Sequence, residues 1–217
     1  MTDDLPNKVD CYADSERDGM VRYQNFKDRR LAPLLDVLTR CGITPNRMTL
    51  ISTLIGLAFV PAYFWSPGLA FGLLIAHLIL DGVDGPLARH TGTASQAGSF
   101  VDTVGDQVVV VATTIALMAS DDESRVIGIV SGSIYCLTYT IVVGFAMIRN
   151  ALRVPYRFIL RPRWIVSVWM IVDHYFLRET LDYLIWGCNA LLIVLTITGF
   201  EAIRSALTDR VKQAESA

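Results

Sequence analysis

The chain has 217 residues, of which 53% are hydrophobic and 18% charged, and its mean hydropathy is +0.43. This composition is too apolar for an ordinary soluble domain, so we expect an all-α polytopic membrane protein with one domain. A formal net charge of −2 excludes the strongly basic balance of nucleic-acid-binding chains, and no nucleic-acid partner is expected.

Residues 1–18 are predicted to form a polar tail, which is acidic and lacks the apolar core of a cleavable signal peptide. Residues 19–42 follow as an amphipathic juxtamembrane helix on the membrane surface, because one face is apolar and the others are charged. A connector that faces water is the alternative, since Pro33 lies inside this segment. The apolar face consists of Leu31, Leu34, Leu35 and Leu38.

Six apolar segments fill residues 45–203, and we expect them to form a six-helix transmembrane domain, followed by a cytoplasmic tail at 204–217. A spanning helix needs roughly 20 residues, so the fifth segment is short for a span. The segments are 48–65, 68–88, 98–119, 126–148, 164–177 and 181–200.

The basic residues support this count. Of the 19 Lys and Arg residues, all but Arg125 and Arg178 fall in the N-terminal region, after the second and fourth segments, or in the C-terminal tail. Six crossings bring these regions to one side, whereas five or seven scatter them. By the positive-inside rule that side is cytoplasmic, which predicts a multi-pass protein of the cell (inner) membrane with both termini inside.

Four aspartates lie at the facing ends of the second and third segments. Asp81 and Asp84 are three residues apart, and Asp102 and Asp106 are four apart, so each pair shares one face of a helix. Converging carboxylates repel one another unless cations neutralise them, and such oxygen ligands suit Mg²⁺ or Mn²⁺. Two ions about 3.5–4 Å apart are a common arrangement for phosphoryl displacement. Helix capping and snorkelling are the alternative roles for these side chains.

The residues around the aspartates suit a phosphorylated substrate. Glycine and alanine let helices or a substrate approach the backbone closely, and they occur at Gly82, Gly85, Ala88 and Gly98. The guanidinium of Arg89 has a fork geometry that matches phosphate. Pro86 is expected to loosen the end of the second segment and expose carbonyl groups there. The four aspartates and these neighbours are therefore the candidate site.

The stretch from Asp81 to Asp106 resembles the signature of the CDP-alcohol phosphotransferase family, D-x2-D-G-x2-A-R-x8-G-x3-D-x3-D, at every fixed position. The resemblance implies a metal-dependent transferase of phospholipid biosynthesis that uses CDP-diacylglycerol or another CDP-linked donor and releases CMP. It implies that Asp81, Asp84 and Asp102 hold a pair of metal ions, and that Asp106 helps to bind metal and is the general base. It further implies that the donor is bound by Asn46, Thr49, Gly82, Gly85, Ala88, Arg89 and Gly98.

The family has two branches, and a short chain with six spans looks like the branch that transfers a phosphatidyl group to a small polar alcohol. The alternative is transfer of a choline- or ethanolamine-type head group to diacylglycerol, and a remote alternative is a cation carrier. Gln107 stands where enzymes that use glycerol phosphate often carry Lys, so serine, inositol phosphate and unphosphorylated polyols stay open.

Arginines after the fourth segment are candidates for binding a phosphorylated acceptor. Arg149, Arg153 and Arg157 are spaced four apart, so one helical face of guanidinium groups can hold a phosphate. Contact with anionic lipid is the alternative. Glycines at multiples of four in the same segment predict a tight helix contact and a homodimer, namely Gly128, Gly132 and Gly144.

Overall fold

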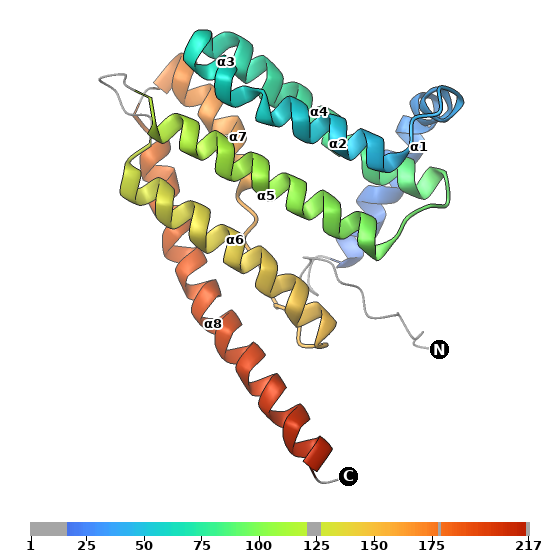
Figure 1. Ribbon diagram of the computed structural model, residues 1–217, viewed down its shortest axis with the longest axis vertical. Helices are drawn as coiled ribbons and strands as arrows, with labels where there is room; N and C mark the ends of the chain where they lie inside the picture. The colour runs from blue at the N-terminus through green and yellow to red at the C-terminus, as the bar shows by residue number, and fades with distance from the viewer. Residues whose placement is uncertain (1–16, 121–126, 178, 216–217) are drawn as a thin grey trace.

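The computed structural model describes residues 17–120, 127–177 and 179–215, and within these ranges the chain is helical, with short connections and no strand (Figure 1). The all-α fold class is confirmed. The tail predicted for residues 1–18 lies almost wholly outside the described residues. The elements are α1 (Arg17–Arg40), α2 (Pro45–Leu57), α3 (Phe59–Trp65), α4 (Pro67–His90), α5 (Gln96–Met118), α6 (Ile129–Ala151), α7 (Arg163–Val172), the π-helical η2 (Asp173–Leu177) and α8 (Leu181–Glu215).

Five helical stretches in the described part are long and apolar enough to cross a membrane, which makes the chain a multi-pass membrane protein. They are Pro45–Trp65, Pro67–His90, Gln96–Met118, Ile129–Ala151 and Leu181–Ala214. The segment predicted at 164–177 forms only the 10-residue α7 and the 5-residue η2. Together they are shorter than the roughly 20 residues that a span needs, so a sixth crossing stays a prediction.

Hydroxyl side chains cap the N-termini of the helices that carry the site. Thr44 and Ser66 each accept a hydrogen bond from a backbone N–H of the first turn, and proline follows each at the first helical position. Ser95 caps α5 in the same way, through the N–H of Gly98. Such caps satisfy backbone donors that have no partner inside the helix. The starts of α2 and α5, which adjoin the candidate site, are therefore fixed by local sequence.

Helix α2 packs against both α4 and α5 and connects them (Figure 1). Two glycines allow the close approach of α2 and α5. A Cβ added at Gly56 would lie 2.7 Å from a methyl group of Val109, and one added at Gly105 would lie 2.7 Å from Oγ1 of Thr53. Carbon atoms at that separation overlap, so larger residues would push the helices apart. The spacing between α4 and α5 thus depends on α2.

The pairing of α6 with α8 closes the other half of the bundle. At the start of α6, the carboxylate of Asp182 accepts hydrogen bonds from the Gly128 N–H, at 2.9 Å, and from the Ser131 hydroxyl. A Cβ at Gly132 would meet Met118 of α5 at 2.5 Å, whereas Gly144 has open space around it within the described residues. Two of the three predicted interface glycines therefore make contacts inside one chain, and the homodimer stays a prediction.

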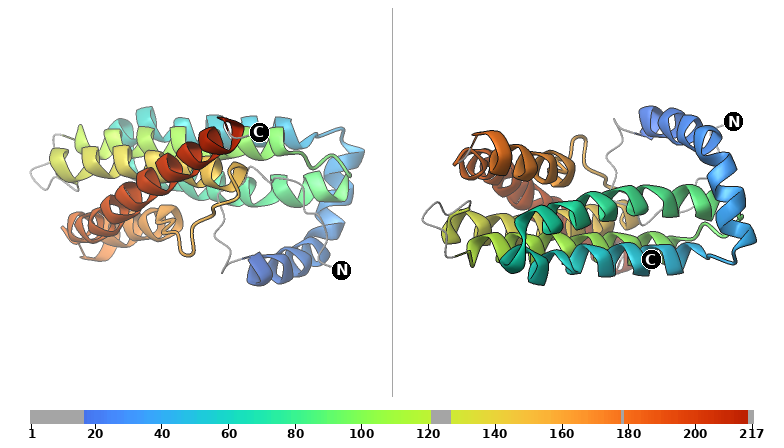
Figure 2. Two further views of the ribbon diagram at one scale, coloured as in Figure 1. Left: turned by 90° about the horizontal axis from the view of Figure 1, so that it is seen from below. Right: turned by 90° about the horizontal axis from the view of Figure 1, so that it is seen from above.

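Helix α1 lies across one end of the bundle and bends along its length (Figure 2). Pro33 lies inside α1 and does not end it. Leu35 is fully buried against Met48, Val83 and Leu87, so part of the leucine face covers protein. Other apolar side chains of α1 are exposed, as an amphipathic surface helix requires; they are Tyr23, Phe26, Leu34 and Val37. Contact of this face with the membrane stays a prediction.

One local expectation needs correction. Helix α4 continues through Pro86 to His90, so the proline does not loosen its end. Proline removes one backbone donor, but the buried contacts of its neighbours Val83 and Leu87 hold the last turns in place. The tail predicted at 204–217 is helical as far as Glu215, as a continuation of α8, and its cytoplasmic position stays a prediction.

Candidate active site

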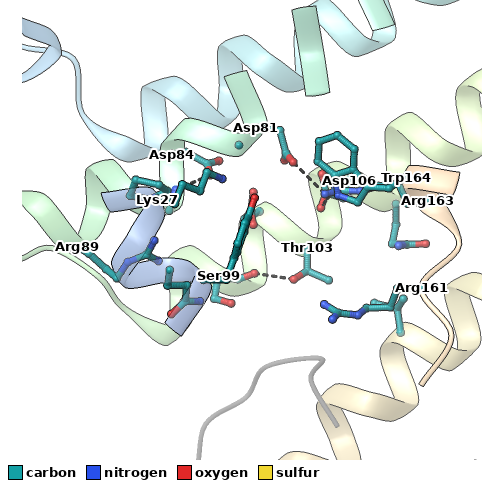
Figure 3. A pocket seen from close by; sticks show the side chains of 18 of the residues that line it. Lys27, Asp81, Asp84, Arg89, Ser99, Thr103, Asp106, Arg161, Arg163 and Trp164 are labelled. Carbon is teal, nitrogen blue, oxygen red and sulfur yellow. Dashed lines mark hydrogen bonds and ion pairs between the residues drawn. The ribbon is translucent and has the colours of Figure 1, made fainter. Parts of the chain in front are cut away.

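The aspartates of α4 and α5 face one another across a cavity of about 450 Å³ (Figure 3). Carboxylate oxygens of Asp81, Asp102 and Asp106 lie within 4.8 Å of one another. Asp81 and Asp106 are largely shielded from solvent, with side chains 7% and 16% exposed. The structure thus brings these three predicted ligands together into one acidic cluster.

The fourth aspartate, Asp84, is held by its neighbours. Its side chain is buried, and its carboxylate accepts a hydrogen bond of 2.7 Å from the Thr49 hydroxyl and one of 2.6 Å from the Gly85 N–H. Asp84 lines the same cavity as the other three aspartates but stands outside the 4.8 Å group. Thr49 therefore links α2 to the acidic site and fixes the orientation of one carboxylate.

Arg163, the first residue of α7, neutralises part of the acidic cluster. Its NH2 group donates to Oδ2 of Asp81 at 2.9 Å, and its NH1 group contacts the carboxylate of Asp106. The Arg163 side chain is only 15% exposed. Arg163 is missing from the predicted site residues, because its sequence signal is no more than a cation directly before an apolar segment.

The acidic cluster fits a divalent cation. Its donors are carboxylate oxygens from two helices, which is the ligand type that Mg²⁺ and Mn²⁺ prefer. Three of them are already close enough to share an ion, and a cationic side chain stands among them. The residues that can hold metal are therefore Asp81, Asp102 and Asp106, with Asp84 beside them.

A second cavity, of about 640 Å³, adjoins the first, because Asp84, Asp102 and Arg89 line both. Of the seven residues predicted to bind the donor, six line this second cavity: Asn46, Thr49, Gly85, Ala88, Arg89 and Gly98. The seventh, Gly82, lines the first. The two adjoining cavities thus lie between the acidic cluster and the start of α2.

Helix α1 also contributes to the site, through side chains that its sequence pattern does not predict there. Lys27 lines the first cavity, and its Nζ lies 3.3 Å from the position of a Cβ added at Gly82. Burial lowers the pKa of Lys27, while the carboxylate of Asp81 opposes that shift. The next residue, Asp28, accepts two hydrogen bonds of 2.7 Å from Arg89. Charged residues on a surface helix are usually solvated, so the pattern gave no signal for these contacts.

The arginines predicted to bind the acceptor lie elsewhere. Arg149 donates to the carbonyl oxygens of Val154, at 2.8 Å, and Pro155, at 3.1 Å, and its guanidinium stands 3.9 Å from the ring centre of Tyr156. Within the described part of the chain, neither Arg149 nor the other two candidates, Arg153 and Arg157, lines either cavity. The cations that line the first cavity from this region are Arg161 and Arg163.

The site thus combines carboxylates that can hold divalent ions with arginine and lysine side chains on both sides, and both kinds of group suit phosphoryl groups. The family model for CDP-alcohol phosphatidyltransferase matches residues 42–202, and the chain belongs to this family.

Curated relatives include two archaetidylinositol phosphate synthases. The one from Aeropyrum pernix is 40% identical over 89 residues, which cover 40% of this chain and 46% of that protein. The one from Pyrococcus horikoshii is 31% identical over 114 residues, which cover 51% and 54%. The chain thus spans about half the length of these relatives.

A solved structure shares the fold. The crystal structure of Mycobacterium tuberculosis phosphatidylinositol phosphate synthase with CDP-DAG bound matches with a TM-score of 0.67 and 19% sequence identity, covering 81% of this chain and 94% of that one. At this identity the likeness concerns the arrangement of the helices.

Proposed function

We propose that this protein transfers a phosphatidyl-type group from CDP-diacylglycerol to the hydroxyl of a small polar alcohol and releases CMP. The observation that carries the proposal is the acidic cluster of Asp81, Asp102 and Asp106, which opens into a cavity lined by signature residues. The names of the relatives support it, because archaetidylinositol phosphate synthases occur among them and the solved structure has CDP-DAG bound.

In the proposed reaction the acceptor hydroxyl attacks the β-phosphorus of the donor. A P–O bond forms, the bond from that phosphorus to the bridging oxygen breaks, and CMP leaves with the bonding electrons. Asp106 accepts the hydroxyl proton, since it is the carboxylate of the cluster that the family signature places last. The four aspartates would hold Mg²⁺ or Mn²⁺, as a pair of ions. When bound, these ions would neutralise the negative charge of the donor pyrophosphate.

Side chains of this chain position the substrates on either side of the cluster. Arg89 and Lys27 lie on one side of the cavity and Arg161 and Arg163 on the other (Figure 3). We assign the first pair to the donor, because Arg89 belongs to the signature. The second pair stands where the acceptor must approach, and guanidinium groups bind phosphate through paired hydrogen bonds.

A phosphorylated acceptor therefore suits the site best. Arg161 and Arg163 both line the cavity beside the proposed base. Arg163 is paired with Asp81 and Asp106, so we assign the acceptor phosphate chiefly to Arg161. The role predicted for Arg149, Arg153 and Arg157 stays a prediction, and its loop contacts give Arg149 a second explanation. Gln107 also lines the cavity, and it offers an amide at the position where enzymes that use glycerol phosphate often carry Lys.

The orientation in the membrane belongs to the proposal as well. The site adjoins α1, the end of α4 and the stretch just before α7, which are all rich in basic residues, and this supports a cytoplasmic site with both termini inside. A lipid-anchored donor then enters from the bilayer and a water-soluble acceptor from the cytoplasm. We retain a homodimer as part of this proposal.

The test is CMP release by purified protein given CDP-diacylglycerol, Mg²⁺ and one acceptor at a time. Inositol phosphate and glycerol phosphate represent phosphorylated acceptors, and serine and inositol represent the others. We expect release with a phosphorylated acceptor. Release only from CDP-choline or CDP-ethanolamine with diacylglycerol would support the other branch, and cation flux without CMP release would support a carrier.

A further inference from the structure

The ion pair between α1 and the signature arginine has a specific geometry. Both oxygens of Asp28 accept hydrogen bonds of 2.7 Å, one from Nε and one from NH2 of Arg89. A bidentate contact of this kind fixes the plane of the guanidinium as well as its position. Asp28 and Arg89 are 61 residues apart in sequence, so the contact depends on how α1 lies across α4.

Asp28 stands behind Arg89 as seen from the site. Arg89 lines both cavities, whereas Asp28, although it belongs to the described residues, lines neither. Gln24, one helical turn before Asp28, lines both cavities, so this face of α1 borders the site. Arg89 is therefore the cavity-lining side chain through which the hydrogen bonds of Asp28 reach a bound donor.

The contact leaves one edge of the guanidinium for the substrate. Asp28 occupies the edge made by Nε and NH2, and NH1 stands over Gly85, 3.5 Å from the position of an added Cβ. Gly85 lines both cavities. The NH1 group is therefore directed along the cavity wall, where a phosphate oxygen of the donor can accept its hydrogen bonds.

We infer that Asp28 is a positioning residue for donor binding, which orients Arg89 so that its NH1 edge meets the donor pyrophosphate. The inference rests on the proposed function for the identity of the donor. It makes α1 a working part of the donor site and not only a surface helix.

Docking of α1 alone does not require this contact. The leucine cluster around Leu35 already holds α1 against α2 and α4. A second ion pair joins the same two helices, between Asp36 and His90 at 2.9 Å, and its Asp36 side chain is 55% exposed. Asp36 lines neither cavity among the residues described. Asp36→Asn is therefore a matched control for loss of an α1 carboxylate that serves docking only.

The experiment compares Asp28→Asn, Asp28→Glu and Asp36→Asn in steady-state CMP release, with separate KM values for CDP-diacylglycerol and for the acceptor. We expect Asp28→Asn to raise the donor KM about five- to tenfold, as when a charged hydrogen bond is weakened, with kcat and the acceptor KM nearly unchanged. Asp28→Glu should recover most of the donor affinity. In an Arg89→Lys background, Asp28→Asn should add no further loss.

Three results would overturn the inference: an unchanged donor KM in Asp28→Asn, a lowered donor KM, which would mean that Asp28 competes with the phosphate, or an equal rise in Asp36→Asn. CDP binding to the purified protein, measured as the rise in the protein's thermal midpoint, gives a readout that needs no turnover. If the wild-type protein binds CDP but releases no CMP, the proposed function fails, and weaker CDP binding by Asp28→Asn still supports the positioning role. A wild-type protein that does not bind CDP overturns both.

Discussion

Replacing Arg163 with Gln removes the cation that contacts both Asp81 and Asp106. These three side chains are 15%, 7% and 16% exposed, so the carboxylates left behind are poorly solvated. Loss of one partner from a buried ion pair costs roughly 3–5 kcal/mol. For a chain of this length each kcal/mol corresponds to about 2–4 °C, so we expect the thermal midpoint in chelator to fall by about 6–20 °C.

Mg²⁺ should reverse most of that loss, because an ion bound by the same carboxylates replaces the missing charge. The assay is the thermal midpoint of purified protein in detergent, in EDTA and over a Mg²⁺ titration. Arg163→Gln should gain more stability from Mg²⁺ than the wild type does, since the arginine no longer competes for the oxygens. Arg149→Gln, which loses only contacts to loop carbonyls and a ring, should be destabilised equally with and without Mg²⁺. Equal Mg²⁺ stabilisation of all three proteins would refute a metal site at this cluster.

Two further variants probe the walls of the site. Thr49→Val removes the hydroxyl that donates to Asp84 at 2.7 Å, and loss of a hydrogen bond to a charged group should lower kcat/KM for the donor by about tenfold or more. Thr138→Val, which loses only a bond to a backbone carbonyl in α6, should leave kcat/KM unchanged. Arg161→Ala should raise the acceptor KM more than Arg149→Ala does, because Arg161 lines the cavity. The reverse order would support acceptor binding by Arg149, Arg153 and Arg157 instead.

The main helices were predictable because their signals are local. Long apolar runs, hydroxyl caps and proline at helix starts are signals within a few residues. Helices α4, α5 and α6 therefore lie close to the predicted segments, and α8 begins at the predicted residue but extends beyond the predicted end. The convergence of the aspartates was also predictable, since their spacing fixes which face of each helix they share.

The partners of the aspartates were not predictable, because tertiary packing selects them. Arg163 lies 57 residues beyond Asp106, and a run of several arginines before α7 gave no reason to choose it. The role of Lys27 depends on α1 crossing α4, which no pattern within α1 encodes. Pro86 predicts a loosened helix end, but buried neighbours on both sides keep the helix intact.

The most direct test of the proposed mechanism is single-turnover CMP release by Asp106→Asn at saturating Mg²⁺ and acceptor. Asn keeps the size of the side chain but cannot accept the hydroxyl proton as a carboxylate does. We predict that this variant keeps measurable CDP-diacylglycerol binding and releases CMP at least about a hundredfold more slowly than the wild type. Release at a near-normal rate would contradict the assignment of Asp106 as the base and, with it, the catalytic role of the acidic cluster.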